Sequence, residues 1–220
     1  MKYEPLKVWR NMESDNTQNQ EKQAMGLVVG DTRVLTPKDY NKVRDGFKKQ
    51  EHKLIFDGLI YTCMRVEEFW RFIGHPEWFD YDRMCINLPP GATLKVKVKQ
   101  KGRTILLSAL GVRVVRDLLD AVRAGKIKEI SNRGWNDDIS RAARRAGFQH
   151  DPNCKIVPKM TRKTYISWLM AVIPDDGLRI TASSGHDSST MIRHYLNLAF
   201  TDQERNEIKM HIQGWGGKSI

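Results

Sequence analysis

Cysteine is scarce in this chain of 220 residues, and its placement excludes two common uses of the residue. Cys63, Cys85 and Cys154 are odd in number, far apart in the sequence and outside any Cys-x-x-Cys pair. This pattern argues against a disulfide framework and against a zinc site built on cysteine. We therefore expect three ordinary thiols in a reducing cytoplasm.

Long hydrophobic runs and acidic residues are also in short supply. No apolar stretch approaches the ~20 residues that a membrane-spanning helix needs, and the polar start of the chain does not resemble a signal peptide. Lys and Arg total 37 against 26 acidic residues, a net charge of +11. Such an excess of positive charge is common because it keeps proteins soluble, but it also favours a polyanionic partner. Nucleic acid is favoured over a membrane because no basic helix carries a matching apolar face.

Composition divides the chain into a polar start and one domain. Residues 13–20 are nearly devoid of apolar groups, so this region cannot bury enough surface to offset its ordering entropy. We expect residues 1–26 to be a flexible tail or the remnant of a linker, in which case the chain is a fragment. Residues 27–220 are long enough to form one domain with its own core.

Hydrophobic periodicity predicts a mixed α+β fold that is mostly helical, with a small antiparallel three-stranded sheet. Asn136 is expected to cap a helix that Gly147 closes, and residues 214–217 are expected to form a loose end. The period changes to two between Tyr81 and Ser108, which predicts strands at 84–86, 94–98 and 104–107. Helices are expected at 37–50, 54–61, 66–73, 112–124, 136–146, 161–173 and 203–211.

The stretch from Gly185 to Tyr195 combines a turn signal with side chains suited to chemistry. Gly185 fits the left-handed turn that closes a helix, and Asp187 can cap the next one. This places His186 at a junction of two helices and Tyr195 about two turns further on. A tyrosine hydroxyl near a histidine and arginines suggests covalent attack on a phosphodiester, although such a tyrosine is also typical of a half-buried core residue.

Two other stretches place cationic side chains at a helix junction and at the start of a helix, where they could bind a phosphate. The segment 62–69 puts Arg65 where two helices meet, and Lys159-Met160-Thr161-Arg162 opens another helix. In chain order the sequence therefore offers Arg, then Lys-x-x-Arg, then Gly-His, then a tyrosine nine residues after the histidine. This arrangement resembles the tyrosine recombinase (integrase) family, whose active site reads Arg, Lys, His-x-x-Arg, His or Trp, Tyr. The resemblance runs from about Leu35 to the end of the chain.

The resemblance implies a catalytic mechanism without metal or other cofactor, because fixed cations stabilise the charge of the transition state. Two arginines would bind the non-bridging phosphate oxygens in a fork geometry, and a histidine would donate to the same oxygens. The tyrosine would attack phosphorus and leave a 3′-phosphotyrosyl link. The implied catalytic residues are Arg65, Lys99, Lys159, Arg162, His186 and Tyr195.

The catalytic lysine of the family lies on a β-hairpin, one or two residues before the turn. Here the predicted turn is 100–102, so Lys99 is the best match, with Lys97 next and Lys101 in the turn itself. The family assigns this lysine the protonation of the leaving 5′ hydroxyl. The plain alternative is that the alternating lysines protect an edge strand from aggregation.

Departures from the family pattern point to one of its branches. Lysine stands at 159 and 163, where the family usually has histidine, and Cys63 replaces a small glycine before Arg65. A lysine at the first position of the His-x-x-Arg box resembles the fusellovirus-type integrases of archaea. Lys159 can still bind phosphate, but acid–base work would require a lowered pKa.

The expected function is therefore that of an integrase catalytic domain that cleaves and rejoins DNA, inserting viral or plasmid DNA into a host chromosome. The implied partners are double-stranded DNA at an attachment site and further copies of the chain, in a dimer or tetramer on that DNA. The alternatives are a DNA-binding protein on the same fold with little activity, such as a truncated integrase relic, and a topoisomerase of the same mechanistic class.

Overall fold

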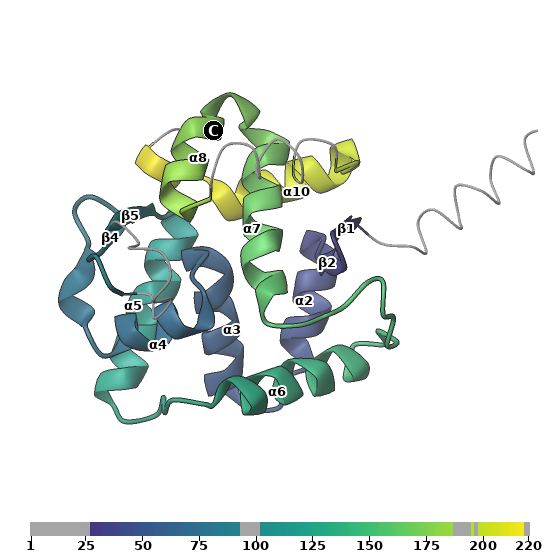
Figure 1. Ribbon diagram of the computed structural model, residues 1–220, viewed down its shortest axis with the longest axis horizontal. Coiled ribbons are helices and arrows are strands. Elements are labelled where there is room, and N and C mark those ends of the chain that lie inside the picture. Colours follow the sequence, from purple (N-terminus) through teal and green to yellow (C-terminus); the bar gives the residue numbers. More distant parts are fainter. Residues whose placement is uncertain (1–26, 93–101, 187–194, 196–197, 218–220) are drawn as a thin grey trace, which may run out of the picture.

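A computed structural model describes residues 27–92, 102–186, 195 and 198–217, and shows the mostly helical architecture that the sequence predicts (Figure 1). Helix α7 runs between α3 and α10, while α6 lies across the end of the molecule away from α8 and α10. None of the described helices is both long and apolar enough to cross a membrane. The helices are α2 (Pro37–Asp45), α3 (Gln50–Thr62), α4 (Val66–Ile73), α5 (Ala109–Arg123), α6 (Asn132–Arg145), α7 (Lys159–Val172), α8 (Gly177–Ser184) and α10 (Asp202–Ile212), with short 3-10 turns η1 (Pro76–Trp78), η2 (Pro174–Asp176) and η3 (Trp215–Gly217).

Two small antiparallel sheets accompany the helices. In the first, β1 (Leu27–Val29) pairs with β2 (Thr32–Val34). The second has the order β3 (Phe79–Asp80), β4 (Cys85–Leu88) and β5 (Arg103–Leu106). Strands β4 and β5 confirm the strands expected at 84–86 and 104–107, and the two pair with each other. The expected strand at 94–98 lies outside the described residues, and β3 was missed because two residues show no periodicity.

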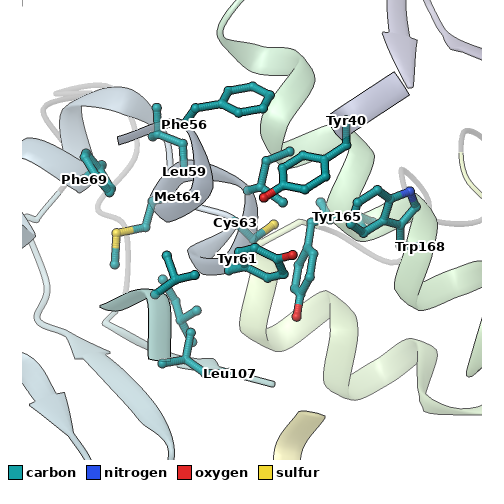
Figure 2. Close-up of a cluster of buried hydrophobic side chains, with 14 of the residues drawn as sticks. Tyr40, Phe56, Leu59, Tyr61, Cys63, Met64, Phe69, Leu107, Tyr165 and Trp168 are labelled. Carbon is teal, nitrogen blue, oxygen red and sulfur yellow. The ribbon is translucent and has the colours of Figure 1, made fainter. Parts of the chain in front are cut away.

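The core is built around α3, whose last eight residues are all buried between α5 and α7. Large aromatic side chains fill the space between these helices (Figure 2). Tyr61 and Tyr165 meet edge to face at 5.7 Å, and Tyr40 meets Trp168 edge to face at 5.8 Å. His211 of α10 accepts or donates a hydrogen bond of 2.7 Å with the Tyr61 hydroxyl, which docks the last helix on this core.

Three local expectations need correction. Asn136 lies inside α6, and the helix is capped instead by Ser131, whose hydroxyl accepts a hydrogen bond of 3.1 Å from the Gly134 amide. The segment 214–217 is not a loose end, because Trp215 is only 1% exposed. The helix expected at 37–50 is shorter and the helix expected at 54–61 is longer, since α2 ends at Asp45 and α3 begins at Gln50.

Gly46 lies at the end of α2, where this helix meets α6. This glycine packs directly against the backbone of α6, and a Cβ atom there would overlap the carbonyl oxygen of Ala142. Arg145 of α6 donates a hydrogen bond of 2.7 Å to the Gly46 carbonyl, which satisfies an acceptor at the helix end. The expected closure of α6 is confirmed by Gly147, which has a φ of +88°.

We predict that Gly46→Ala lowers the free energy of unfolding by about 1–3 kcal/mol, because backbone atoms must move to admit the new methyl group. Gly177→Ala is the matched control, since Gly177 is the first residue of α8 and an added Cβ meets no atom within 4 Å. The control should change stability by less than about 1 kcal/mol. Urea denaturation measures both, and equal stabilities of the two variants would contradict this account of the contact between α2 and α6.

Candidate active site

The corner between α3 and α4 positions Arg65. Helix α3 ends at Cys63, whose φ of +54° is left-handed, a conformation that favours glycine and turns the chain sharply. Arg65 is then the N-cap of α4, and its backbone amide donates to the carboxylate of Glu68 at 2.9 Å. The Arg65 guanidinium donates to the same carboxylate at 2.7 Å. The sequence context that places Arg65 at a helix junction is thus confirmed.

Glu68 is a fully buried carboxylate that gathers three arginines. Besides Arg65, the Arg103 guanidinium from β5 donates two hydrogen bonds to it, at 2.6 and 3.1 Å. Arg162 from α7 lies 3.8 Å away. A buried carboxylate is costly unless it is paired, and here three cations surround it. Neither Glu68 nor Arg103 was predicted as a site residue, although a glutamate three residues after a helix cap is a known capping signal.

Arg162 lies in the first turn of α7, as expected, and is held by the ends of two other helices. Its guanidinium donates to the carbonyl of Cys63, which caps α3, at 3.0 Å, and to the carbonyl of Ser184, the last residue of α8. The carbonyl ends of helices carry partial negative charge, so they suit a guanidinium. Burial, followed by the charges of Arg65 and Arg103, lowers the pKa of Arg162.

His186 follows the end of α8, where Gly185 has the expected left-handed conformation with a φ of +66°. The Nδ1 atom of His186 lies 3.1 Å from the Ser184 hydroxyl and 3.4 Å from the Arg162 guanidinium. A guanidinium can only donate, so Nδ1 accepts and the ring proton belongs on Nε2. The expected cap Asp187 and the residues that follow it up to 194 lie outside the described residues.

Tyr195 is 4% exposed, and its ring meets that of His186 edge to face at 6.0 Å. Burial raises the pKa of its hydroxyl to about 12, the nearby Cys63 adds to the effect, and Arg162 opposes it. The phenol is therefore neutral at neutral pH. The tyrosine is thus both a buried residue and a neighbour of the histidine and arginine, so burial alone does not decide between the two interpretations.

One pocket of about 560 Å³ brings these groups together. It contains five of the six residues that the resemblance implies, while Lys99 lies outside the described residues. Four cations face a single carboxylate, Glu67, in its lining. The lining residues are Met64, Arg65, Val66, Glu67, Asn132, Asn136, Pro158, Lys159, Arg162, Lys163, His186 and Tyr195.

The two lysines of the pocket have different surroundings. Lys159 donates to the Asp31 carboxylate at 2.8 Å and is half exposed. Lys163 donates to the carbonyl of Val29 at 2.7 Å and to the Thr32 hydroxyl at 3.1 Å, and burial lowers its pKa. No cluster of three or more metal-binding side chains occurs in the part of the chain that the structure describes. The chemistry that this lining suits is therefore the binding of an anion next to a tyrosine.

The raised pKa of Tyr195 predicts how stability depends on alkaline pH. Folded protein keeps a phenol proton that the unfolded chain loses, so the stabilisation is complete below pH 10 and is lost as the pH rises towards 12. We expect Tyr195→Phe to lose about 1.4 kcal/mol less unfolding free energy than the wild type between pH 9 and pH 11. Denaturant titrations at several pH values measure this difference, and parallel pH curves for the two proteins would contradict it.

Comparison with known proteins identifies the fold. No family model matches the chain, and neither does any curated protein. A crystal structure of XerA recombinase matches with 19% identity and a TM-score of 0.54, covering 80% of this chain and 64% of that one. XerH site-specific recombinase bound to difH substrate before cleavage matches with 17% identity and a TM-score of 0.54, covering 80% of this chain and 52% of that one.

The post-cleavage complex of XerH with a palindromic difH substrate gives 15% identity and a TM-score of 0.52, over 82% of this chain and 52% of that one. The chain thus spans between half and two thirds of the length of these recombinases. Identities this low establish architecture alone. The chain has the tyrosine recombinase catalytic fold.

Proposed function

We propose that this chain is the catalytic domain of a tyrosine-type site-specific DNA recombinase, which cleaves and rejoins DNA through a 3′-phosphotyrosyl intermediate. The observation that supports this most strongly is the single pocket shared by Arg65, Lys159, Arg162, His186 and Tyr195. These residues come from the α3–α4 corner, the start of α7, the end of α8 and a point beyond it. The fold is independent support, because it is shared with XerA and XerH recombinases.

The charge of the pocket fits a phosphodiester. Arg65 and Arg162 carry forked donors that match two non-bridging oxygens, and Glu68 behind them holds both guanidinium groups near one another. Negative charge on these oxygens grows on the way to the pentavalent transition state, so fixed cations stabilise that state more than the ground state. The Nε2 proton of His186 adds a further donor.

The proposed step exchanges one phosphate ester for another. The Tyr195 oxygen forms a bond to phosphorus while the bond from phosphorus to the 5′ oxygen breaks, and the 3′ phosphate stays on the tyrosine. The phenol gives up its proton as it attacks, and the leaving 5′ oxygen takes one up. Arg162 favours the ionised tyrosine, against the effect of burial. Lys99 remains the predicted donor to the 5′ oxygen, with Lys97 and Lys101 as the alternatives on the same hairpin.

The biological setting is part of the same proposal. The reaction would insert viral or plasmid DNA at an attachment site in a host chromosome, in the host cytoplasm, with further copies of the chain assembled on the DNA. Lys159 at the first position of the box, where histidine is usual, supports assignment to the archaeal fusellovirus-type branch. The two XerH structures matched in fold hold a difH substrate, which is consistent with a DNA partner here.

A nicked duplex that traps the covalent intermediate tests the function. Cleavage next to the nick releases a short fragment, so religation fails and the protein–DNA adduct accumulates. We expect the wild type to form the adduct and Tyr195→Phe to form none, because the attacking oxygen is the only atom removed. Both should bind the duplex equally in a gel-shift titration. Tyr165→Phe is the matched control, since it removes another buried hydroxyl that does not line the pocket.

Adduct formation by Tyr195→Phe would contradict the assignment of the nucleophile. Duplex binding by the wild type without any adduct would favour the alternative, a DNA-binding protein with little activity. Relaxation of supercoiled plasmid without a sequence preference would favour the topoisomerase.

Tyr195 lines the pocket formed by its own chain, which supports attack in cis. We predict that a mixture of Tyr195→Phe and Arg65→Ala forms no adduct on the nicked duplex. In a trans arrangement, the tyrosine of the Arg65→Ala copy would act in the intact pocket of the Tyr195→Phe copy and restore cleavage. Arg65 suits this experiment because its side chain is 30% exposed and Arg103 still pairs with the buried Glu68 carboxylate when Arg65 is removed. Recovery of adduct in the mixture would show attack in trans.

A further inference from the structure

The hairpin of β1 and β2 holds two of the four cations that line the pocket. Lys159 is bound through Asp31, in the turn of the hairpin, and Lys163 through the Val29 carbonyl and the Thr32 hydroxyl. Both lysines belong to the first turns of α7, more than 120 residues further along the chain. The sequence does not predict a role for the hairpin in the site, because no local pattern indicates this long-range contact.

The hairpin is itself fixed in place, so it can act as a support. Its strands pair Leu27 with Val34 and Val29 with Thr32, around a turn at Gly30 with a φ of +63°. Its backbone is tied to Lys155, since the Lys155 amide donates to the Asp31 carbonyl at 2.8 Å and the Arg33 amide donates to the Lys155 carbonyl at 2.9 Å. These bonds set the backbone of Asp31 relative to the start of α7.

Asp31 uses both carboxylate oxygens on the lysines near it. Oδ1 accepts from Lys159 at 2.8 Å and from the Thr32 hydroxyl at 2.9 Å, while Oδ2 accepts from Lys155 at 2.9 Å. The hydrogen bond from Lys159, followed by that from Lys155, holds the pKa of Asp31 far below its usual range. Asp31 is therefore an anion at any physiological pH, and it always offers Lys159 a charged acceptor.

Asp31 contacts Lys159 without lining the pocket itself. Lys159 lines the pocket, whereas neither Asp31 nor any other residue of the hairpin does. An ammonium has three donors, and Asp31 accepts one of them, which leaves Lys159 able to donate to a phosphate oxygen at the same time. Because the two side chains are 52% and 40% exposed, their ion pair contributes little to folding stability. Orientation of the ammonium is the effect that the geometry favours.

We propose that Asp31 is a positioning residue that orients the Lys159 ammonium towards a phosphodiester in the pocket; this role rests on the function proposed above. Lys159 then has a defined role in the pocket. The lysine acts as a fixed cation for phosphate, with its carboxylate partner in the hairpin, and takes no part in proton transfer. A histidine side chain is shorter than that of lysine, so the contact with Asp31 in the hairpin depends on the lysine.

The first test compares cleavage rates in a double-mutant cycle under single-turnover conditions. Asp31→Asn should slow adduct formation by about 10-fold, because the orienting charge is lost while the shape is kept. The matched control is Asp120→Asn, which removes one carboxylate from an exposed ion pair with Arg123 and lies outside the pocket. It should cleave as the wild type does. In the Lys159→Ala background, Asp31→Asn should cause no further loss.

The second test measures binding to random duplex DNA and does not depend on cleavage. Each lost phosphate contact makes the dependence of log affinity on log salt shallower by about 0.9. Lys159→Ala and Asp31→Asn should show the same shallower slope, and Asp120→Asn should keep the wild-type slope. A merely structural role of Asp31 would lower the melting temperature and leave this slope unchanged.

The outcomes separate this proposal from the proposed function. Loss of cleavage in Asp31→Asn that persists in the Lys159→Ala background, or a wild-type salt slope in Asp31→Asn, would overturn the role of Asp31 even if the protein is a recombinase. A wild type that forms no adduct yet shows the expected pattern of slopes would overturn the recombinase assignment and keep Asp31 as the partner that orients Lys159.

Discussion

The buried carboxylate of Glu68 is the constraint on which the candidate site depends. It connects α4, β5 and α7 through Arg65, Arg103 and Arg162, which are far apart in the sequence. Guanidinium groups this close would repel each other without an anion between them. One carboxylate for three cations leaves the cluster positive, so it both holds the arginines together and keeps them suited to an anionic substrate.

Helix ends provide the second level of support. The carbonyl ends of α3 and α8 converge on the Arg162 guanidinium, and each end is shaped by a left-handed residue, Cys63 or Gly185. The same turn at Gly185 delivers His186 to Arg162. The backbone at these helix ends thus places an arginine and a histidine side by side. The β1–β2 hairpin likewise holds the two lysines of α7 through hydrogen bonds.

Much of this arrangement could be read from the sequence where the signals are local. The cap-and-proline start of α2, the apolar spacing of α4 and the glycine after α8 all gave the observed elements. The order of Arg65, Lys159, Arg162, His186 and Tyr195 indicated one site, and the structure places these residues in one pocket; their catalytic roles remain predictions.

What the sequence concealed depends on tertiary contacts. The pairing of Arg103 with Glu68 spans 35 residues, and that of Lys159 with Asp31 spans 128. Ser131 and Asn136 are both good caps, so composition alone could not decide which one begins α6. Trp215 lies among glycines that suggest a loose end, yet it is buried next to the Arg179 guanidinium, a contact that no local pattern records.

The most direct measurement of the central claim is the identity of the residue that becomes attached to DNA. The chain has six tyrosines, and trypsin would release Tyr195 in the peptide 194–205, which contains no other tyrosine. After trapping on a nicked duplex and digestion with nuclease and trypsin, mass spectrometry should find this peptide carrying a nucleotide through a 3′-phosphotyrosyl bond. Attachment at any other residue, or an unmodified peptide in a preparation that binds the duplex, would contradict the account.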